Sequence, residues 1–481
     1  MLDRLEMPRR LFRNTLALSS AQVARIGFNS ILSLLIARLL GVEGLGKYAV
    51  LTAYLQIFQV LIAMGAPRLV VREIARRVHH EEGKRHWFQV MLVNQVLGAG
   101  IGALVLVVLA HVLNHPPATV RALGIVSLSL FPFAVSSAVE AVLRAEERMA
   151  LIALAQIVSR GVQVVGSVVV LLAGEGIVAL AGMLVTGQVM AALIEVWVVR
   201  SAGVWRHFHV DMVEAIRLSR TSSAFFAQSV LVVLFSRVGI LILAQMAGEE
   251  AAGLYSAAHL VIQVVNFLSV SYSRAAYPVL ARLYGEGVDR FRGLLCRSIL
   301  FGLLATLIIV IQIVTVARPI VHLLYGESYA ASVQVLQVEA PFIAVFLWNA
   351  LLSNGLLASD LQRRSVVVSG LKLGMSLIYY PLLTACLGAV GTALGTLLAG
   401  LTGAVLNYYF LSREVCSLDV LRLVVKPLFT GVLVLGGLHL ARGAPWPGLM
   451  IGGLLLYLVL LIVFRVVPRE DVRVLRRIVL S

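Results

Sequence analysis

Long apolar stretches alternate with short polar segments along the entire chain. A helix needs roughly 20 apolar residues to cross the hydrocarbon core of a bilayer, and fourteen stretches come close to that length. Breaker clusters such as Pro116-Pro117 separate several of them. The pattern predicts an all-α polytopic membrane protein with about fourteen transmembrane helices. The predicted spans are 15–37, 48–70, 88–112, 120–143, 151–173, 177–199, 221–246, 253–277, 294–317, 331–357, 366–387, 390–411, 427–441 and 447–466.

The amino-acid composition agrees with this pattern, because 60% of the residues are apolar, 13% are charged and the mean hydropathy is +0.95. Soluble domains usually carry about 25% charged residues, so a water-soluble fold is excluded. The three cysteines, Cys296, Cys386 and Cys416, are widely spaced, and the ten histidines form no metal-binding pattern. His111 and His115 are four residues apart but fall in a short loop that contains prolines. We therefore expect no metal and no cofactor.

The formal net charge of +16 would by itself suit a nucleic-acid partner. The distribution of the charge gives another explanation. With the N-terminus placed in the cytoplasm, and with Arg121, Arg297 and Arg465 at the ends of spans counted with the adjoining segments, 29 of the 40 Lys and Arg residues fall on predicted inside segments and 5 on outside loops. This bias follows the positive-inside rule and predicts that both termini are cytoplasmic. We expect membrane lipids, and no nucleic acid, to meet most of this charge.

A short motif occurs twice, each time in a predicted outside loop. Its members Gly41, Glu43, Gly46 and Tyr48 recur 207 residues later as Gly248, Glu250, Gly253 and Tyr255. The repeat unit contains six predicted helices, so both copies share one orientation and a pseudo-two-fold axis along the membrane normal would relate them. This predicts an N-terminal lobe over 1–220, a C-terminal lobe over 221–426, and a helix pair with a cytoplasmic tail over 427–481. The basic segment 472–480 of that tail predicts an interfacial helix.

Five predicted spans carry polar side chains at helical spacing: 15–37, 48–70, 151–173, 253–277 and 366–387. Polar groups are costly in hydrocarbon, so they face the interior of a bundle or a water-filled cavity. Hydrogen bonds between helices are the alternative explanation. Because five helices share the pattern, we favour an aqueous cavity between the two halves.

Cations lie inside the predicted spans, and those most distant from the helix ends are Arg25, Arg160 and Arg237, with Lys372 less deep. The carboxylates within spans are few: Glu140, Glu195 and Glu339. A cation near the midplane is costly unless it is paired or hydrated, and these carboxylates can neutralise few of the cations. The excess of positive charge points to an anionic ligand. The forked guanidinium group suits phosphate particularly well.

The features that a membrane enzyme needs are missing from the sequence. The predicted outside loops are short, the longest being 318–330, and no phosphate-binding P-loop motif occurs. We therefore expect no catalytic residues and no intrinsic ATPase activity.

Several segments resemble a known family. They are Ile36-Ala-Arg-Leu-Leu-Gly41, Gly65-Ala-Pro-Arg68, Gly253-Leu-Tyr255 and Leu323-Leu-Tyr325-Gly326. The sequence resembles the polysaccharide flippases (Wzx-type) of the MATE-like exporter superfamily, also called the MOP superfamily. This resemblance covers nearly the whole chain and implies fourteen helices, arranged as two six-helix lobes and an extra pair.

The resemblance implies a function. Such a flippase moves a polyprenyl-pyrophosphate-linked oligosaccharide, such as an O-antigen unit of lipopolysaccharide or another surface polysaccharide repeat unit, across the bacterial or archaeal cytoplasmic (inner) membrane. We expect alternating access through a central cationic cavity, a monomer, and other glycan-assembly proteins as candidate partners. The predicted substrate-binding residues are Arg25, Arg160, Arg237 and Lys372, with Gln22, Asn29, His259, Gln263 and Asn266 as polar lining.

Three alternatives stay open. A lipid II flippase shares the fold and the cationic site, whereas a MATE-type multidrug exporter of cationic drugs would favour acidic cavity residues. A membrane-embedded glycan-assembly enzyme is the third. One departure from the family pattern concerns the seventh helix, where an acidic residue often follows an arginine but Val238 and Gly239 follow Arg237 here. His259 could titrate as a switch, although we expect a histidine with satisfied hydrogen bonds.

Overall fold

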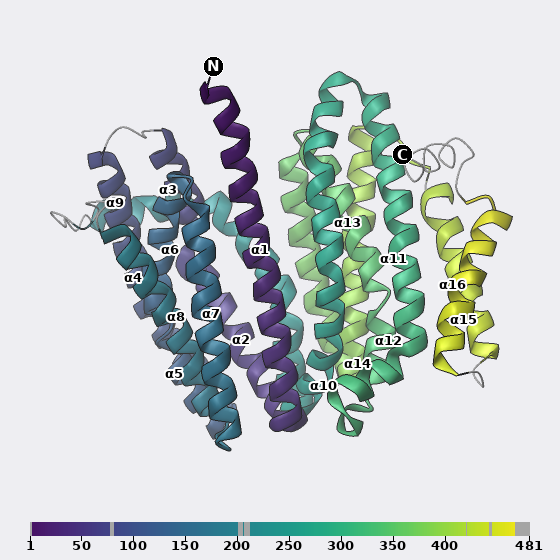
Figure 1. Cartoon of the computed structure of the whole chain (residues 1–481), viewed down its shortest axis with the longest axis horizontal. Coiled ribbons are helices and arrows are strands. Elements are labelled where there is room, and N and C mark those ends of the chain that lie inside the picture. Colours follow the sequence, from purple (N-terminus) through teal and green to yellow (C-terminus); the bar gives the residue numbers. More distant parts are fainter. Residues whose placement is uncertain are drawn as a thin grey trace. The chain divides into compact units, whose positions relative to one another are not determined.

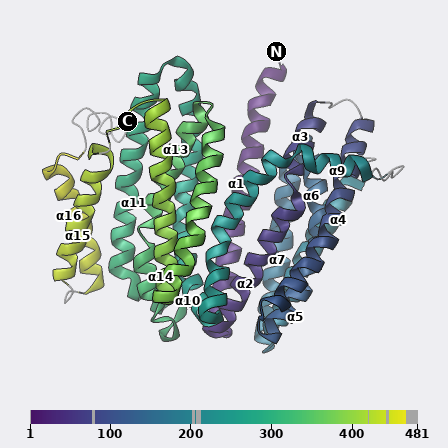
Figure 2. The same ribbon diagram turned by 180° about the vertical axis from the view of Figure 1, so that it is seen from behind.

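The computed structural model describes residues 2–76, 81–200, 205, 212–419, 421–441 and 445–466. Within these residues every regular element is helical (Figures 1 and 2). The first helices are α1 (Leu2–Leu39), α2 (Gly41–Ala63), α3 (Ala66–Arg76), α4 (Glu81–Val112), α5 (Pro117–Ser127), α6 (Leu130–Ala145), α7 (Met149–Leu172), α8 (Ile177–Val199) and α9 (Met212–Thr221). They are followed by α10 (Ser223–Glu286), α11 (Val288–Tyr325), the 3-10 helix η2 (Glu327–Tyr329), α12 (Ser332–Glu339), α13 (Phe342–Ala358), α14 (Gln362–Glu414), the π-helix η3 (Leu421–Val425), α15 (Lys426–Leu440) and α16 (Trp446–Val463).

The predicted all-α polytopic class is confirmed. Twelve helical segments of the described chain are long and apolar enough to cross a membrane. Two of them, 225–286 and 362–414, are interrupted by glycines with positive φ, Gly248 (φ 85°) and Gly388 (φ 56°). Each therefore has the length for two crossings, and counting these two twice turns twelve into the fourteen that the sequence predicts.

The two copies of the repeated motif do not form loops, which corrects the prediction. α1 ends at Leu39 and α2 begins at Gly41, so residues 41–48 form the first two turns of α2. A single glycine with positive φ, Gly41 (φ 71°), is enough to separate the two helices. In the second copy, α10 bends at Gly248 and is helical again directly after it.

Three of the predicted spans each consist of two helices. The breaks lie between α2 and α3, between α5 and α6, and between α12 and α13. The second helix of each pair has a proline at its start: Pro67 in α3, Pro132 in α6 and Pro341 at the N-cap of α13. Proline has no N–H group to donate, so it fits the first turn of a helix and disfavours a continuous one.

The chain forms two compact units, residues 1–253 and 254–481. The first unit contains α1 to α9 and the part of α10 that precedes the repeated tyrosine. This division assigns the first half of α10 to the N-terminal unit, whereas the repeat predicts lobes over 1–220 and 221–426. The predicted lobes are defined by the repeat and not by packing, so they stay predictions. The predicted interfacial helix 472–480 lies outside the described residues.

The first unit is built around an apolar core between α3, α4, α6, α8 and α9. Val70, Met91, Val142 and Val199 are fully buried there. The short helix α9 is amphipathic and turns Ala215 and Leu218 into the same core. α1 packs along α7, and α7 packs on α8, which places the helix with the first predicted cation beside the helix with the second.

In the second unit, α11 packs against α13 and against the C-terminal helix pair α15–α16. Both views of the fold show this pair at the edge of the unit (Figures 1 and 2). Two hydrogen bonds fix α16 on α11: Gln312 Nε2 donates to the carbonyl of Met450 (3.0 Å), and the buried Tyr457 hydroxyl donates to the carbonyl of Leu304 (3.2 Å). α13 packs along α14, which carries the last predicted cation.

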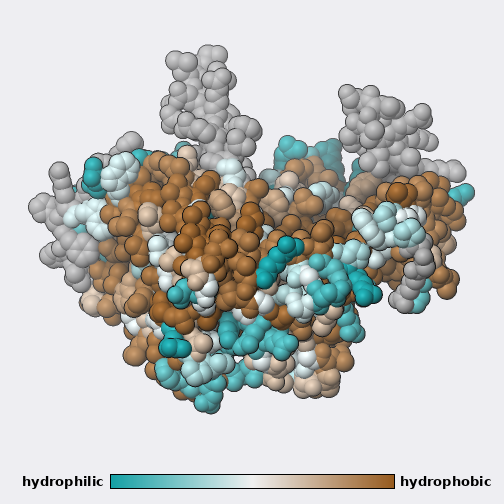
Figure 3. Space-filling model, turned by 60° about the horizontal axis from the view of Figure 1, so that its bottom comes forward, coloured by the Kyte–Doolittle hydropathy of each residue, from teal (hydrophilic) through white to brown (hydrophobic). Residues whose placement is uncertain are grey.

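Large apolar side chains lie on the surface of the helices. Ile101, Leu104, Val169 and Leu172 are each more than half exposed, and Figure 3 shows hydrophobic residues over much of the face in view. Water-soluble proteins rarely expose apolar patches of this extent. A lipid environment explains them, so this surface supports a multi-pass membrane protein.

Within the first unit, the two copies of the motif pack against each other through their glycines. A Cβ atom placed on Gly46 would lie 1.7 Å from the carbonyl oxygen of Glu249, and one on Gly253 would lie 1.9 Å from the carbonyl oxygen of Val42. Only glycine allows backbones to approach this closely. The glycines of the motif are therefore explained by a close contact between helices. Lys47 adds ion pairs to Glu43 (2.6 Å) and Glu249 (3.8 Å).

The glycine contact leads to a first prediction. Gly46→Ala should destabilise the protein, because its methyl group would overlap the backbone of α10 and overpacking costs about 1–3 kcal/mol or more. Gly100→Ala in α4 is the matched control, since a Cβ at Gly100 meets nothing within 4 Å. Thermal unfolding of the purified protein in detergent measures the effect. Equal melting temperatures for the two variants would show that the glycine contact carries no stability.

Candidate functional site

The first unit brings together two of the predicted cations, Arg25 of α1 and Arg160 of α7. Arg25 is exposed and Arg160 is partly buried, and the two guanidinium groups are close enough to repel each other electrostatically. Arg25 Nη2 donates to Gln22 Oε1 at 3.0 Å, and Arg160 Nη1 donates to Gln163 Oε1 at 2.8 Å. Both acceptors are neutral amides, so these hydrogen bonds orient the guanidinium groups without cancelling their charge.

The carboxylates of the described spans do not form ion pairs with these two arginines. Glu140 is paired with Arg144 and accepts a hydrogen bond from Gln156 Nε2 at 2.8 Å. Glu195 is almost fully buried, at 1% exposure. Within the described chain, no carboxylate lies within ion-pair distance of Arg25 or Arg160. The two arginines therefore keep a local positive charge.

Tyr48, the last residue of the first motif copy, belongs to this site although sequence analysis treated it only as a repeat residue. Its side chain is buried, at 8% exposure, and interacts electrostatically with Arg160. The signal that could have identified it is its counterpart Tyr255, because a tyrosine at the same motif position also reaches the polar cluster of the second unit.

Arg237, on the first half of α10, has a different partner. Its Nε donates to Gln56 Oε1 of α2 at 2.9 Å. Gln56 is one of the polar residues that follow the first motif copy along α2. In the family, an acidic residue often follows this arginine, but Val238 and Gly239 stand there in this chain. Arg237 donates instead to the neutral amide of Gln56.

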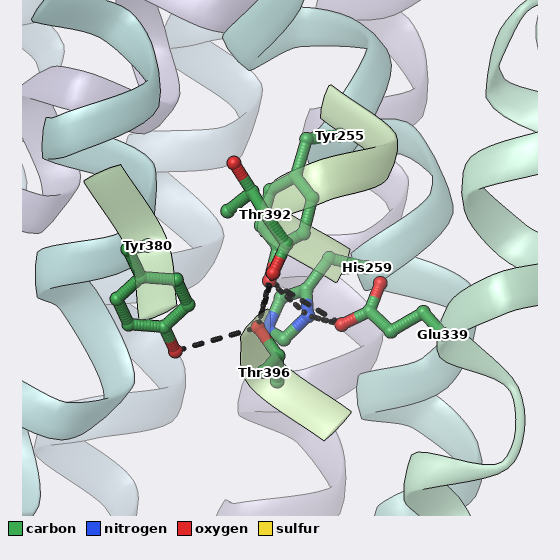
Figure 4. Close-up of polar contacts among 6 residues, drawn as sticks. All are labelled: Tyr255, His259, Glu339, Tyr380, Thr392 and Thr396. Atoms are coloured by element: carbon green, nitrogen blue, oxygen red, sulfur yellow. Dashed lines mark hydrogen bonds and ion pairs between the residues drawn. The ribbon is translucent and has the colours of Figure 1, made fainter. Parts of the chain in front are cut away.

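The second unit contains a polar cluster around His259 of α10 and Glu339 of α12 (Figure 4). His259 Nδ1 lies 2.5 Å from Glu339 Oε1. The Tyr255 hydroxyl donates to the same oxygen at 3.4 Å and contacts Thr396 Oγ1 at 3.2 Å. The rings of Tyr255 and His259 stack, with centroids 5.4 Å apart. Nδ1 of His259 thus has a partner, and both the expectation of a histidine with satisfied hydrogen bonds and its predicted role in substrate binding stay predictions.

Lys372 lies on α14 before its bend at Gly388, whereas Thr396 of the polar cluster lies after it. Its side chain runs beside Gly403, where a Cβ would come within 2.8 Å of Lys372 Cδ and 3.1 Å of Asn349 Oδ1. Asn349 Oδ1 accepts a hydrogen bond from Asn407 Nδ2 at 2.8 Å. The glycine therefore makes room for the lysine stem next to a pair of asparagines.

The remaining predicted lining residues lie on α1 and α10. Gln22 is the partner of Arg25, and Asn29 is exposed on the same helix. Gln263 is exposed on α10, while Asn266 is partly buried and its Oδ1 has no hydrogen-bond partner within the described chain. Gln263 and Asn266 follow His259 at steps of four and three residues, which places the three on one helix face.

The structure gives no support for a metal site. No group of three or more metal-ligating side chains occurs among the residues that the structure describes. His111 Nδ1 contacts the carbonyl of Val107 (2.8 Å), and His115 Nε2 contacts the hydroxyl of Tyr54 (3.0 Å). Burial lowers the pKa of His115, which lies between α4 and α5. Each histidine of the pair thus has its own partner.

Comparisons with known proteins identify the fold and the family. No curated protein sequence matches the chain. Among solved structures, it is similar to "Lipid II flippase MurJ, inward closed conformation", with 14% identity over 94% of this chain and 99% of that chain and a TM-score of 0.74. It is also similar to an inward-facing multidrug resistance MATE family transporter of the MOP superfamily, with 16% identity over 84% of this chain and 98% of that chain and a TM-score of 0.66. At these identities the likeness shows a shared fold.

The family follows from the sequence itself. The pattern of the family described as "Polysaccharide biosynthesis protein" matches residues 11–284, which is more than half of the 481 residues. The match includes both copies of the motif, the whole of α7, α1 from residue 11 onward and α10 up to residue 284. The chain therefore belongs to the polysaccharide biosynthesis protein family, whose Wzx-like flippases the sequence resembles.

Proposed function

We propose that the protein is a flippase that moves a polyprenyl-pyrophosphate-linked oligosaccharide, such as an O-antigen unit or another surface polysaccharide repeat unit, across the cytoplasmic membrane. The family membership supports a role in polysaccharide biosynthesis. The fold shared with a lipid II flippase and with MATE transporters supports transport of an unchanged substrate, and not an enzymatic reaction. Alternating access is the mechanism that we propose for this transport.

The observation that carries the proposal is the pair Arg25 and Arg160. Both guanidinium groups are held by neutral glutamines, and no carboxylate of the described chain pairs with them. A pyrophosphate diester carries one ionised oxygen on each phosphate, so two arginines match its charge. The forked donors of arginine can bind two oxygens of one phosphate group. This chemistry recognises the link between lipid and sugar and is independent of the sugar sequence.

The same observation argues against a multidrug exporter. Cationic drugs would be repelled by Arg25 and Arg160, and the carboxylates that could attract them, such as Glu140 and Glu339, are already paired. Lipid II, in contrast, is also a polyprenyl pyrophosphate. A lipid II flippase is therefore the second candidate, and the similarity to MurJ over almost the full length of both chains favours it specifically.

The arginine pair leads to a second prediction. Changing Arg25 and Arg160 together to Gln should reduce export of surface polysaccharide in the native host at least tenfold. The physical reason is that each hydrogen bond to a charged group contributes about 1.5–3 kcal/mol. Surface polysaccharide is measured by electrophoresis and immunoblotting, at equal protein abundance in the membrane.

The control is Arg121→Gln, which removes an exposed arginine from α5 and should leave export unchanged. Binding of purified protein to polyprenyl pyrophosphate, measured by microscale thermophoresis, should weaken in the double variant. Full export by the double variant would refute the proposed anion site.

A third prediction separates the two flippase candidates. The gene should restore surface polysaccharide in a host strain that lacks it, and should not support growth of a strain depleted of its own lipid II flippase. Immunoblotting of the membranes of both strains checks that the protein is present in each. Rescue of growth, without an effect on surface polysaccharide, would assign the protein to lipid II.

A further inference from the structure

The second unit buries an ion pair that the proposed recognition of an anion does not use. Glu339 of α12 is 0% exposed, and its Oε1 lies 2.5 Å from Nδ1 of His259, whose side chain is 22% exposed. The other oxygen, Oε2, is buried and has no hydrogen-bond partner within the described chain. The charge of the carboxylate is therefore compensated at one oxygen only, by the histidine and by the hydroxyl of Tyr255.

We propose that His259 and Glu339 form a proton-binding site. In the loaded state the imidazolium of His259 donates its Nδ1–H to Glu339 Oε1, and the pair is neutral overall. Release transfers one proton from Nε2 of His259 to water and leaves a neutral imidazole that still donates Nδ1–H to the carboxylate. The unloaded pair then carries a net charge of −1.

A buried, uncompensated carboxylate is strongly disfavoured in a medium of low dielectric constant. Because Oε2 has no donor of its own, the proton can leave only when water reaches the pair. The partly exposed ring of His259 is the route by which water can do so. Proton release is thus tied to a change in hydration of this site, which is the property that a proton-driven conformational change needs.

The ligand of the site is a proton and not a metal cation. Hard cations such as sodium or calcium prefer oxygen ligands, but a histidine nitrogen occupies the contact with Oε1. The titratable groups that face the pair from the packed helices are Tyr255 on α10 and Tyr380 on α14, the latter through Thr396 (3.4 Å). On α11, Tyr325 donates instead to the carbonyl of Ala257 (3.1 Å). None of these tyrosines supplies a second positive charge.

A chain of hydroxyl groups connects the pair with the bend of α14. Tyr255 contacts Thr396, Thr396 donates to the carbonyl of Thr392 (3.0 Å), and the hydroxyl of Thr392 contacts the carbonyl of Gly388 (3.5 Å). Gly388 is the residue with non-helical backbone angles at which α14 bends. A change in the charge of Glu339 would therefore alter hydrogen bonds that end at the bend. The step from proton binding to transport rests on the proposed flippase function, whereas the proton site does not.

The test is ¹⁵N nuclear magnetic resonance of histidine-labelled protein in lipid nanodiscs, without any substrate. The ¹⁵N shifts distinguish imidazolium from neutral imidazole, and His259→Gln identifies the signal of His259. We expect a larger fraction of the His259 rings to be protonated in the wild type than in Glu339→Gln at the same pH, because this substitution keeps the shape of the side chain but removes the charge that faces Nδ1. The control Glu327→Gln removes a carboxylate that is 81% exposed and paired with His322, and should leave the His259 signal unchanged.

Equal protonation of the His259 ring in the wild type and in Glu339→Gln at every pH measured would overturn the proposal. A parallel measurement of surface polysaccharide in cells distinguishes this failure from failure of the proposed function. If deletion of the gene leaves polysaccharide unchanged, the flippase assignment fails but the resonance experiment still decides on the proton site. If deletion abolishes polysaccharide and the His259 signal does not respond to Glu339→Gln, only the proton site fails.

Discussion

A polar side chain within the apolar spans needs a partner in the protein or in a water-filled cavity, because lipid offers none. The ionisable groups of the described spans differ in the kind of partner that they have. Glu140 has Arg144 as its partner, and Glu339 has His259. Arg25 and Arg160 are held by glutamines instead. Neutral partners fix the direction of a guanidinium group but leave its charge available for a ligand.

The repeated motif shows how the backbone positions these groups. Gly46 and Gly253 let two helices of the first unit meet at backbone distance. A tyrosine lies two residues after each glycine, at the start of a long polar stripe. Tyr48 interacts with Arg160, and Tyr255 interacts with Glu339 and His259. One sequence motif thus supplies both a close helix contact and a hydroxyl for the polar cluster of its own unit.

The length of the apolar stretches was sufficient to predict the membrane-spanning segments, because a membrane span imposes a length and a composition that are visible in the sequence. It could not predict how the spans end. Gly41 and Gly248 separate helices with a single residue of positive φ, where the polar motif resembles a loop. Likewise, the cations of the site were identified by their depth in the spans, but their partners were not. The pairing of His259 with Glu339 joins residues 80 positions apart, and no local spacing reveals such a contact.

The two units differ in the chemistry that they offer. The arginine pair of the first unit carries fixed charge, because a guanidinium group does not lose its proton in a protein. As the proton-binding site that we propose, the pair of the second unit would change its charge by one proton, which a guanidinium group cannot do. A fixed charge suits a ligand that is always an anion, such as a pyrophosphate diester. A variable charge suits a conformational change that proton binding drives in one direction and proton release reverses. A flippase driven by protons would need both properties, and their position on different helices would allow one to change while the other stays constant.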